Sequence, residues 1–428
     1  MAAATDGRAG TLRKAGTVLA VGAALMLSAC GSGPHAAPLP SARTASPPLG
    51  GASSRAGSPR TSPTAVPTSW PCLGISDIEM VSSQVGWALS VLGPEPCTGV
   101  AGDGAVLRTS DGGRRWSIVS PPPAPQAQRL YELDALSATR AVAVTAAPWT
   151  SEPPAVAVTT DGGTIWATST LPRQGAAGML PAGVSFVGRD GWALMLGDAS
   201  MGRQDAILYR TTDAGAAWHP VPTSPPHGIP VGGYKAGIVF RSAEAGYATA
   251  SNNGNGRPQL FVTTDAGATW STEDVAAPAG VPGGWTATLL PGFFTPRRGV
   301  LPVVFGGGSA EELCLYGTVD GGTTWTANPL QPLPGAGSLP PVATAAPDNV
   351  WVADGPTLER SADGGRTWTA TTPGAPFTGV AMLDFTDPAH GWAIAAAGRG
   401  GDALLATTDG GQTWRALHPS VAPARPAR

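Results

Sequence analysis

Carboxylates are the most regularly placed side chains in this sequence that could take part in acid–base chemistry. Seven aspartates occupy the third position of an octapeptide of the form (Ser/Thr)-x-Asp-x-Gly-x-x-Trp, which returns about every 50 residues. They are Asp111, Asp161, Asp213, Asp265, Asp320, Asp363 and Asp409. Two carboxylates that met across a cleft could hydrolyse a glycosidic bond. Such even spacing instead indicates a structural role, because a repeated unit of secondary structure repeats its turn.

The chemistry of the octapeptide suits a tight turn between two strands. Aspartate accepts hydrogen bonds from the N–H groups that a turn leaves open, and glycine adopts positive φ without steric cost. The leading Ser or Thr hydroxyl can join the same network. The tryptophan leaves the turn as a large apolar group that needs burial. We therefore predict that the aspartates shape turns and that these tryptophans pack in the core: Trp116, Trp166, Trp218, Trp270, Trp325, Trp368 and Trp414.

Each octapeptide follows further short apolar runs, and several are preceded by a Gly-aromatic-Ala strand such as Gly391-Trp392-Ala393. Each unit reads as four antiparallel strands, with no convincing helical period. We predict an all-β fold, a seven-bladed β-propeller with four antiparallel strands per blade and the acidic turn between strands 3 and 4. Residues 71–419 form this domain and residues 420–428 a disordered tail. Because no strand is donated across the two ends, we expect the ring to close by face packing.

The N-terminal region predicts export and anchoring. Residues 1–29 have a basic start and a short apolar run, which is typical of a signal peptide. Leu27-Ser28-Ala29-Cys30 resembles the lipobox of bacterial lipoproteins, in which the cysteine is lipidated. An ordinary secretory signal is the alternative. Residues 30–70 are rich in Pro, Ser and Ala, so we expect the lipidated Cys30 to be followed by a disordered tether.

The remaining cysteines fit an oxidising compartment. Cys72 and Cys97 lie at the entry to the first unit and after its second strand, and we predict a disulfide between them. Cys314 lies in an apolar run and is expected to be a buried thiol.

The seven octapeptides resemble the Asp boxes, or bacterial neuraminidase repeats, of sialidases, sortilin-type receptors and some glycoside hydrolases. Their pairing with Gly-Trp-Ala strands is more similar still to the photosystem II stability/assembly factor family and its non-photosynthetic bacterial relatives. The last unit shows this best, with Gly391-Trp392-Ala393 followed by Thr408-Asp409-Gly410-Gly411-Gln412-Thr413-Trp414. The resemblance implies that the box aspartates lie at the rim of the blades, away from the central pocket.

The enzymes of these families rely on defined catalytic groups. A sialidase requires three clamping arginines, a late Tyr nucleophile and usually a Phe/Tyr-Arg-Ile-Pro motif; the motif is absent, and the last tyrosine is Tyr316. A xyloglucan-type hydrolase uses a cleft between two tandem propellers, and this chain is long enough for only one propeller. We expect the acidic pairs to be solvated: Glu132/Asp134, Glu273/Asp274 and Glu311/Glu312. Asp384 could face the central channel and is a candidate pocket residue.

Other chemistry has little support. The five histidines show no metal-ligand spacing, so no metal or cofactor is predicted. There is no Gly-x-Ser-x-Gly motif and no phosphate loop. A formal net charge of −3 argues against nucleic-acid binding.

These features predict a non-catalytic, lipid-anchored and monomeric module on the outer face of the cytoplasmic membrane. It would bind an unidentified envelope protein or glycan, or assist assembly, through three longer loops at Gly197–Asp205, Asn252–Arg257 and Gly306–Glu312. The alternative is a divergent extracellular glycoside hydrolase that uses Asp384 and a second carboxylate. A purely structural wall-associated protein is a third interpretation.

Overall fold

The computed structural model describes residues 73–92, 104–122, 128–147, 152–174, 179–221, 228–254, 256–307, 310–334, 339–374, 377–397 and 401–422. Every regular element in these ranges is a β-strand. We number the units one to seven by the acidic turn, the octapeptide above, that each contains. Among the described residues there is no helix that is long and apolar enough to cross a membrane.

The first three units form separate sheets. Unit one contains β1 (Leu73–Met80), β2 (Gly86–Leu92), β3 (Ala105–Thr109) and β4 (Arg115–Ile118). Unit two contains β5 (Arg129–Ala135), β6 (Ala141–Ala146), β7 (Ala155–Thr159) and β8 (Ala167–Thr170). Unit three contains β9 (Leu180–Val187), β10 (Asp190–Ser200), β11 (Arg203–Thr211) and β12 (His219–Val221).

Units four and five share one ten-stranded sheet. Unit four contains β13 (Tyr234–Phe240), β14 (Gly246–Asn253), β15 (Gln259–Thr263) and β16 (Ser271–Glu273). Unit five contains β17 (Trp285–Thr288), β18 (Gly292–Phe293), β19 (Gly299–Gly307), β20 (Ala310–Thr318), β21 (Thr326–Ala327) and β22 (Gln331–Pro332). The two units join because the end of β14 pairs with β17, with Ser251 opposite Ala287 and Asn253 opposite Trp285.

The last two units again form separate sheets. Unit six contains β23 (Val342–Ala345), β24 (Asn349–Asp354), β25 (Thr357–Ser361) and β26 (Thr369–Thr371). Unit seven contains β27 (Val380–Phe385), β28 (Gly391–Ala397), β29 (Gly401–Thr407) and β30 (Arg415–Leu417). Consecutive strands within these two units pair antiparallel, as in Gly391 opposite both Phe385 and Thr407.

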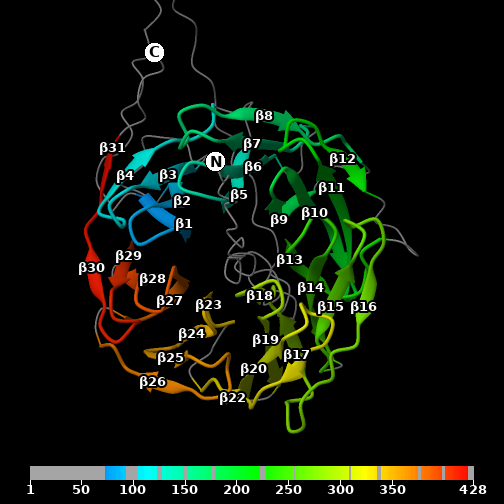
Figure 1. Cartoon of the computed structure of the whole chain (residues 1–428), viewed down its shortest axis with the longest axis vertical. Helices are drawn as coiled ribbons and strands as arrows, with labels where there is room; N and C mark the ends of the chain where they lie inside the picture. Colours follow the sequence, from blue (N-terminus) through cyan, green and yellow to red (C-terminus); the bar gives the residue numbers. More distant parts are fainter. Residues whose placement is uncertain are drawn as a thin grey trace, which may run out of the picture.

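The sheets are arranged around a common centre, and in units one to four, six and seven the first strand lies innermost and the fourth towards the outside (Figure 1). Seven apolar clusters hold the described residues together, and each draws side chains from two neighbouring units. One of them packs Ile78 and Trp116 of unit one against Trp392 and Leu404 of unit seven. The sheets therefore bury one another's faces, as an all-β fold of the propeller type requires.

The two ends of the chain meet through a strand that the sequence did not predict. β31 (Ser420–Ala422) pairs parallel to β4, with Val421 opposite Trp116, and becomes the outer fifth strand of unit one. Val421 is buried in the cluster between units one and seven. The expectations of closure by face packing alone and of a disordered tail beginning at residue 420 were therefore wrong. Three residues with one apolar side chain give too little pattern to reveal a strand.

Candidate functional site

The acidic turns have a consistent internal geometry, which the seventh unit illustrates. Asp409 Oδ1 accepts hydrogen bonds from the hydroxyl of Thr407 at 2.7 Å and the backbone N–H of Thr413 at 3.0 Å. The hydroxyl of Thr413 donates to Asp409 Oδ2 at 2.6 Å, and the N–H of Gly411 donates to the Thr407 hydroxyl at 3.0 Å. The carboxylate thus replaces carbonyl acceptors that the turn lacks. In each of the other six units the box aspartate also accepts hydrogen bonds from its own turn.

The two glycine positions of the turn differ in what they tolerate. The first adopts positive φ, 75° at Gly410, and alanine occupies it at Ala214 and Ala266 with φ of 67° and 62°. These two alanines hold a left-handed conformation that costs about 1–2 kcal/mol for a residue with a Cβ. At the second position, a Cβ on Gly411 would lie 2.3 Å from a methyl group of Leu358 in the preceding unit. The second glycine therefore permits close packing of neighbouring units.

Hydrogen bonding also sets the charge state of these turns. At Asp363, burial favours the neutral acid, but the hydrogen bonds from Thr367, Ser361 and Arg366 outweigh it and lower the pKa to about 2. At Asp320 the hydroxyl of Thr324 makes the largest contribution, and the pKa is again lowered. These aspartates remain ionised at neutral pH and have their oxygens turned into the backbone. They do not have the environment of a general acid, whose pKa must be raised.

The box tryptophans continue from the turns into the interfaces between units. Five of them are buried: Trp116, Trp166, Trp218, Trp270 and Trp414. Trp325 and Trp368 are partly buried and pack against the apolar clusters of unit five. The indole N–H of Trp414 donates to the carbonyl of Gly411 at 3.1 Å. Trp116 and Trp270 donate in the same way to Gly113 and Gly267, whereas the indole of Trp166 donates to the carbonyl of Val119 in unit one.

Asp384, the candidate pocket residue, bridges the last and first units. It is the penultimate residue of β27, and its Oδ2 accepts the backbone N–H of Met80 at the end of β1 at 2.6 Å. The same arrangement recurs between other units. Glu79 Oε2 accepts the N–H of Ala135, and the Ser185 hydroxyl accepts the N–H of Phe240 at 2.9 Å. A polar residue just before the end of an innermost strand thus ties its unit to the next.

Two of the three acidic pairs expected to be solvated are partly covered. Glu132 is 7% exposed on β5, and the Oε2 atoms of Glu311 and Glu312 are buried. These positions look like loop or edge residues in the sequence because nothing in the local pattern shows which faces meet. The third pair fits the expectation better, since the Asp274 side chain is 83% exposed and contacts Arg257 at 3.2 Å.

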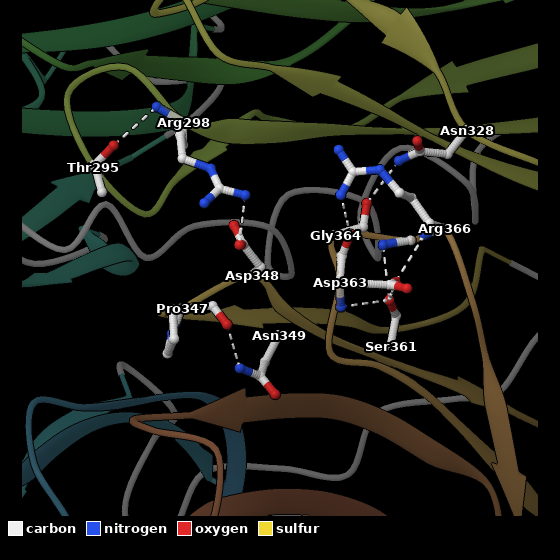
Figure 2. A network of polar contacts seen from close by, with 11 residues as sticks. Thr295, Arg298, Asn328, Pro347, Asp348, Asn349, Ser361, Asp363, Gly364 and Arg366 are labelled. Carbon is white, nitrogen blue, oxygen red and sulfur yellow. Dashed lines mark hydrogen bonds and ion pairs between the residues drawn. The ribbon is translucent and has the colours of Figure 1, made fainter.

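The interface between units five and six is tied at the end that carries the acidic turns (Figure 2). Arg298 Nη2 contacts Asp348 Oδ2 at 2.6 Å, and the Asn328 side chain donates to the carbonyl of Gly364 at 2.7 Å. Arg366 donates to the carbonyl of Asp363 at 2.9 Å within the acidic turn of unit six. Charge and hydrogen bonds thus join the two units at this end.

The three candidate contact loops connect β10 to β11, β14 to β15 and β19 to β20 in the consecutive units three, four and five. In an antiparallel unit these connections emerge at the end opposite the acidic turn, so all three lie on one face. Gly197–Asp205 is largely strand, a projecting hairpin with Met201 99% exposed at its tip. It rests on the segment before β13, where the N–H of Gln204 donates to the carbonyl of Val231 at 2.9 Å.

The other two loops are held by strand pairing. Asn252–Arg257 begins within β14, and the hydroxyl of Thr286 donates to the carbonyl of Arg257 at 3.0 Å. Gly306–Glu312 spans the end of β19 and the start of β20. Residues 255 and 308–309 of these loops lie outside the described ranges.

Lys235 and Cys314 are buried side chains that carry reactive groups. Burial lowers the pKa of Lys235 to about 8, and its Nζ donates to the carbonyl of Gly232 at 2.6 Å. Burial raises the pKa of the Cys314 thiol to about 12, so this free cysteine is a packed side chain rather than a nucleophile. Sequence reasoning had not singled out Lys235, because a lysine at the start of an apolar strand gives no sign that it is covered.

The predicted lipid anchor and disulfide involve cysteines that the structure does not describe. Cys30, Cys72 and Cys97 lie outside the described residues, so the lipid anchor and the disulfide remain predictions. Within the described residues, no group of three or more His, Cys, Asp or Glu side chains could hold a metal ion.

Solved structures similar to this chain share its fold. No protein-family model and no curated protein matches the sequence. A puromycin-hydrolyzing peptidase of Mycobacterium tuberculosis matches with a TM-score of 0.52 and 13% identity, over 84% of this chain and 56% of that one. YCF48 bound to D1 peptide matches with a TM-score of 0.45 and 20% identity, over 69% of this chain and 84% of that one. The β-propeller domain of the Trilobed protease from Pyrococcus furiosus matches with a TM-score of 0.48 and 9% identity, over 81% of this chain and 97% of that one. At these identities the likeness concerns the fold alone.

Proposed function

We propose that the seven units form one closed seven-bladed propeller whose acidic turns are Asp boxes, and that the protein is a non-catalytic binding or assembly-assisting module. The seven apolar clusters, one of them between units one and seven, support the closed ring. The observation that carries the functional proposal is the use of the box carboxylates. Each accepts hydrogen bonds from its own turn, so the repeated acid builds shape and leaves contact to the loops on the opposite face.

The glycoside hydrolase alternative needs Asp384 as an acid or nucleophile. Its Oδ2 accepts the N–H of Met80 at 2.6 Å, and the same kind of bond recurs at Glu79 and Ser185. We therefore retain the binding module as the proposed function.

The contact face is tested by site-specific photo-crosslinking in cells. A crosslinking amino acid at Met201, 99% exposed at the hairpin tip, probes the loop-bearing face. The same amino acid at Ile165, 71% exposed in the acidic turn of unit two, is the matched control on the opposite face. We expect a discrete envelope protein or glycan adduct from position 201 only. Identical adducts from both positions, or none from position 201, would contradict the proposal.

The anchor is tested separately through the cysteine of the lipobox. We propose that Cys30 carries a lipid that holds the chain on the outer face of the cytoplasmic membrane as a monomer. Cys30→Ser should move the protein from the membrane fraction to the soluble fraction. Cys314→Ser is the control, because that thiol is buried in unit five. Equal membrane retention of both variants would contradict lipid anchoring.

A further inference from the structure

The projecting hairpin of unit three is fastened to unit four by backbone hydrogen bonds. The N–H of Gln204 donates to the carbonyl of Val231 at 2.9 Å, and the N–H of Gly233 donates to the carbonyl of Gly202 at 2.8 Å. Residues 228–233, which we call the strap, lead directly into β13 of unit four. The strap therefore carries the hairpin on one side and continues into the first strand of the next unit on the other.

Lys235 joins the strap to the hairpin. Its Nζ donates to the carbonyl of Gly232 at 2.6 Å and to the carbonyl of Gly233 at 3.2 Å, so the amine holds the strap. Its backbone N–H donates to Oε1 of Gln204 in the hairpin at 2.8 Å. The residue is 5% exposed, so this junction is closed to solvent.

The amine of Lys235 lies in apolar surroundings that suit its neutral form. Lys235 pairs with Ala250 of β14, and its Nζ lies 5.2 Å from the centre of the Phe261 ring. Ala250 and Phe261 both belong to the apolar cluster between units three and four. A neutral amine has two N–H bonds for the two strap carbonyls, whereas an ammonium group has three. The ring face attracts a cation, but burial outweighs this attraction and lowers the pKa of Lys235 to about 8.

Lysine is rare in this chain, whose basic residues are nearly all arginine. Of its 26 Lys and Arg residues, only Lys14 and Lys235 are lysines. An arginine at position 235 would stay charged at every pH at which the protein is folded, because a guanidinium group does not lose its proton in proteins. Lys235 is therefore the one Lys or Arg side chain of residues 73–422 that can become neutral near physiological pH.

The other charged groups near β13 lie in solvent or in a pair of their own. The strap, β9 and β15 contain no ionisable side chain, and residues 222–227 add His227 but no acid. Asp198, Arg203 and Asp205 of the hairpin are exposed, and Asp190 pairs with Arg210 at 3.0 Å. The remaining ionisable side chains of β11, β13 and β14 are Tyr209, Tyr234 and Tyr247. Burial is the cause of the lowered pKa of Lys235, with no contribution from a charged group of the described residues.

We propose that Lys235 is a proton-operated latch for the projecting hairpin. As a neutral amine it holds the strap, and with it the hairpin, against unit four. When the amine binds a proton, its charge favours water over the apolar cluster, and the strap and the hairpin loosen together. The ligand of the latch is the proton.

The direction of the effect follows from linkage. A lysine whose folded pKa lies below its unfolded value binds fewer protons in the closed state than in the open one. The closed latch is therefore weakest below about pH 8, strengthens as the pH rises, and levels off above the unfolded value of about 10.5. Because the hairpin carries Met201, loosening would also displace a candidate contact loop; that consequence rests on the proposed function, whereas the latch does not.

Hydrogen exchange of the full chain, without a partner, tests the latch directly. The amides of Gln204, Gly233 and Lys235 donate the hydrogen bonds that join the hairpin to the strap and β13. They are followed by rapid mixing at about pH 7.5 and about pH 9.5, with rates corrected for the intrinsic pH dependence of exchange. We expect roughly tenfold better protection at the higher pH. The amides of β6 and β7, which carry no titratable side chain, are the internal control and should show no such change.

Variants then assign the effect to the amine. Lys235→Met has no proton to bind, so its protection should not depend on pH in this range. Lys235→Arg stays charged and should show the weak, neutral-pH protection at both pH values. Arg203→Gln removes an exposed charge from the same hairpin and is the matched control, which should keep the pH dependence of the wild type.

Three results would overturn the latch. The first is wild-type protection of the three amides that does not change with pH, and the second is an equal change in β6 and β7. The third is a Lys235→Met variant that keeps the pH dependence of the wild type. If Lys235→Arg fails to fold, the comparison of the wild type with Lys235→Met still decides the outcome.

Discussion

At the scale of single residues, Asp363 shows how a charged group can maintain backbone shape. Its two carboxylate oxygens accept four hydrogen bonds, from the Ser361 hydroxyl, the Arg366 N–H, the Thr367 N–H and the Thr367 hydroxyl. A turn that reverses the chain leaves N–H groups without carbonyl partners, and a short acid with two acceptor oxygens is the side chain that can serve several of them. The repeated aspartate is thus explained without catalysis.

Asp363→Ala should lower the free energy of unfolding by about 1–2 kcal/mol, since several N–H and hydroxyl groups of a largely solvent-accessible turn lose their acceptor. Chemical denaturation measures this loss. Because the folded pKa of Asp363 is depressed to about 2, its contribution is present above the unfolded value near 4 and disappears as the pH falls towards 2. The difference between wild type and variant should therefore shrink in acid. Asp198→Ala, on an exposed part of the projecting hairpin, is the control and should leave the denaturation midpoint unchanged.

The residue patterns also show what a sequence can and cannot reveal about the site. The role of Asp409 could be predicted because every partner in its turn lies within four residues along the chain. The role of Asp384 could not, because its partner Met80 is 304 residues away and is brought near only when the last unit meets the first. The burial of Glu311 Oε2 was missed for the same reason, since the local sequence does not show which faces of neighbouring units meet.

At the scale of secondary structure, β31 is the element that joins the two ends of the chain. The strand order and the turns between strands could be predicted, because alternating apolar residues and Asp-Gly turns are local signals. β31 pairs parallel with β4 and buries only Val421. These residues form a strand because they pair with the edge of unit one, and the sequence near residue 420 gives no sign of that edge.

Truncation after Pro419 removes this strand and tests its contribution. We expect the melting temperature to fall by several degrees, because Val421 leaves the cluster shared by units one and seven and the β4 edge loses its partner. Truncation after Ala422 is the matched control and should melt like the full chain. The point variant Val421→Asp should reproduce most of the loss. If neither truncation after Pro419 nor Val421→Asp lowers the melting temperature, β31 does not hold the two ends together.

At the scale of the whole molecule, units one and seven meet through several kinds of contact. The Trp392 indole donates to the carbonyl of Gly112 at 3.0 Å, and Asp384 accepts the N–H of Met80. The apolar cluster around Trp116 and Leu404 lies between them. The ends are therefore joined at the inner strands, through the sheet faces and at the outer edge by β31.

Asp384→Ala should weaken the contact between units one and seven, with a loss of about 1–3 kcal/mol in the free energy of unfolding, because the Met80 N–H loses its charged acceptor. Hydrogen exchange at Met80 should rise in parallel. Asp274→Ala, which removes an exposed acid from unit four, is the control. A variant that kept wild-type stability but lost a measurable glycosidase activity would favour the hydrolase over the binding module.

Because β14 pairs with β17, units four and five should unfold more cooperatively with each other than other neighbouring units do. Units four and five share one sheet through backbone hydrogen bonds along Ser251–Asn253, whereas the other units in the described part of the chain have separate sheets. Regions linked in this way tend to open together as one foldon, whereas side-chain interfaces can part individually. Partial unfolding should therefore spare this pair and begin elsewhere in the ring, leaving a half-open molecule that still presents the loops of units four and five in their native relation.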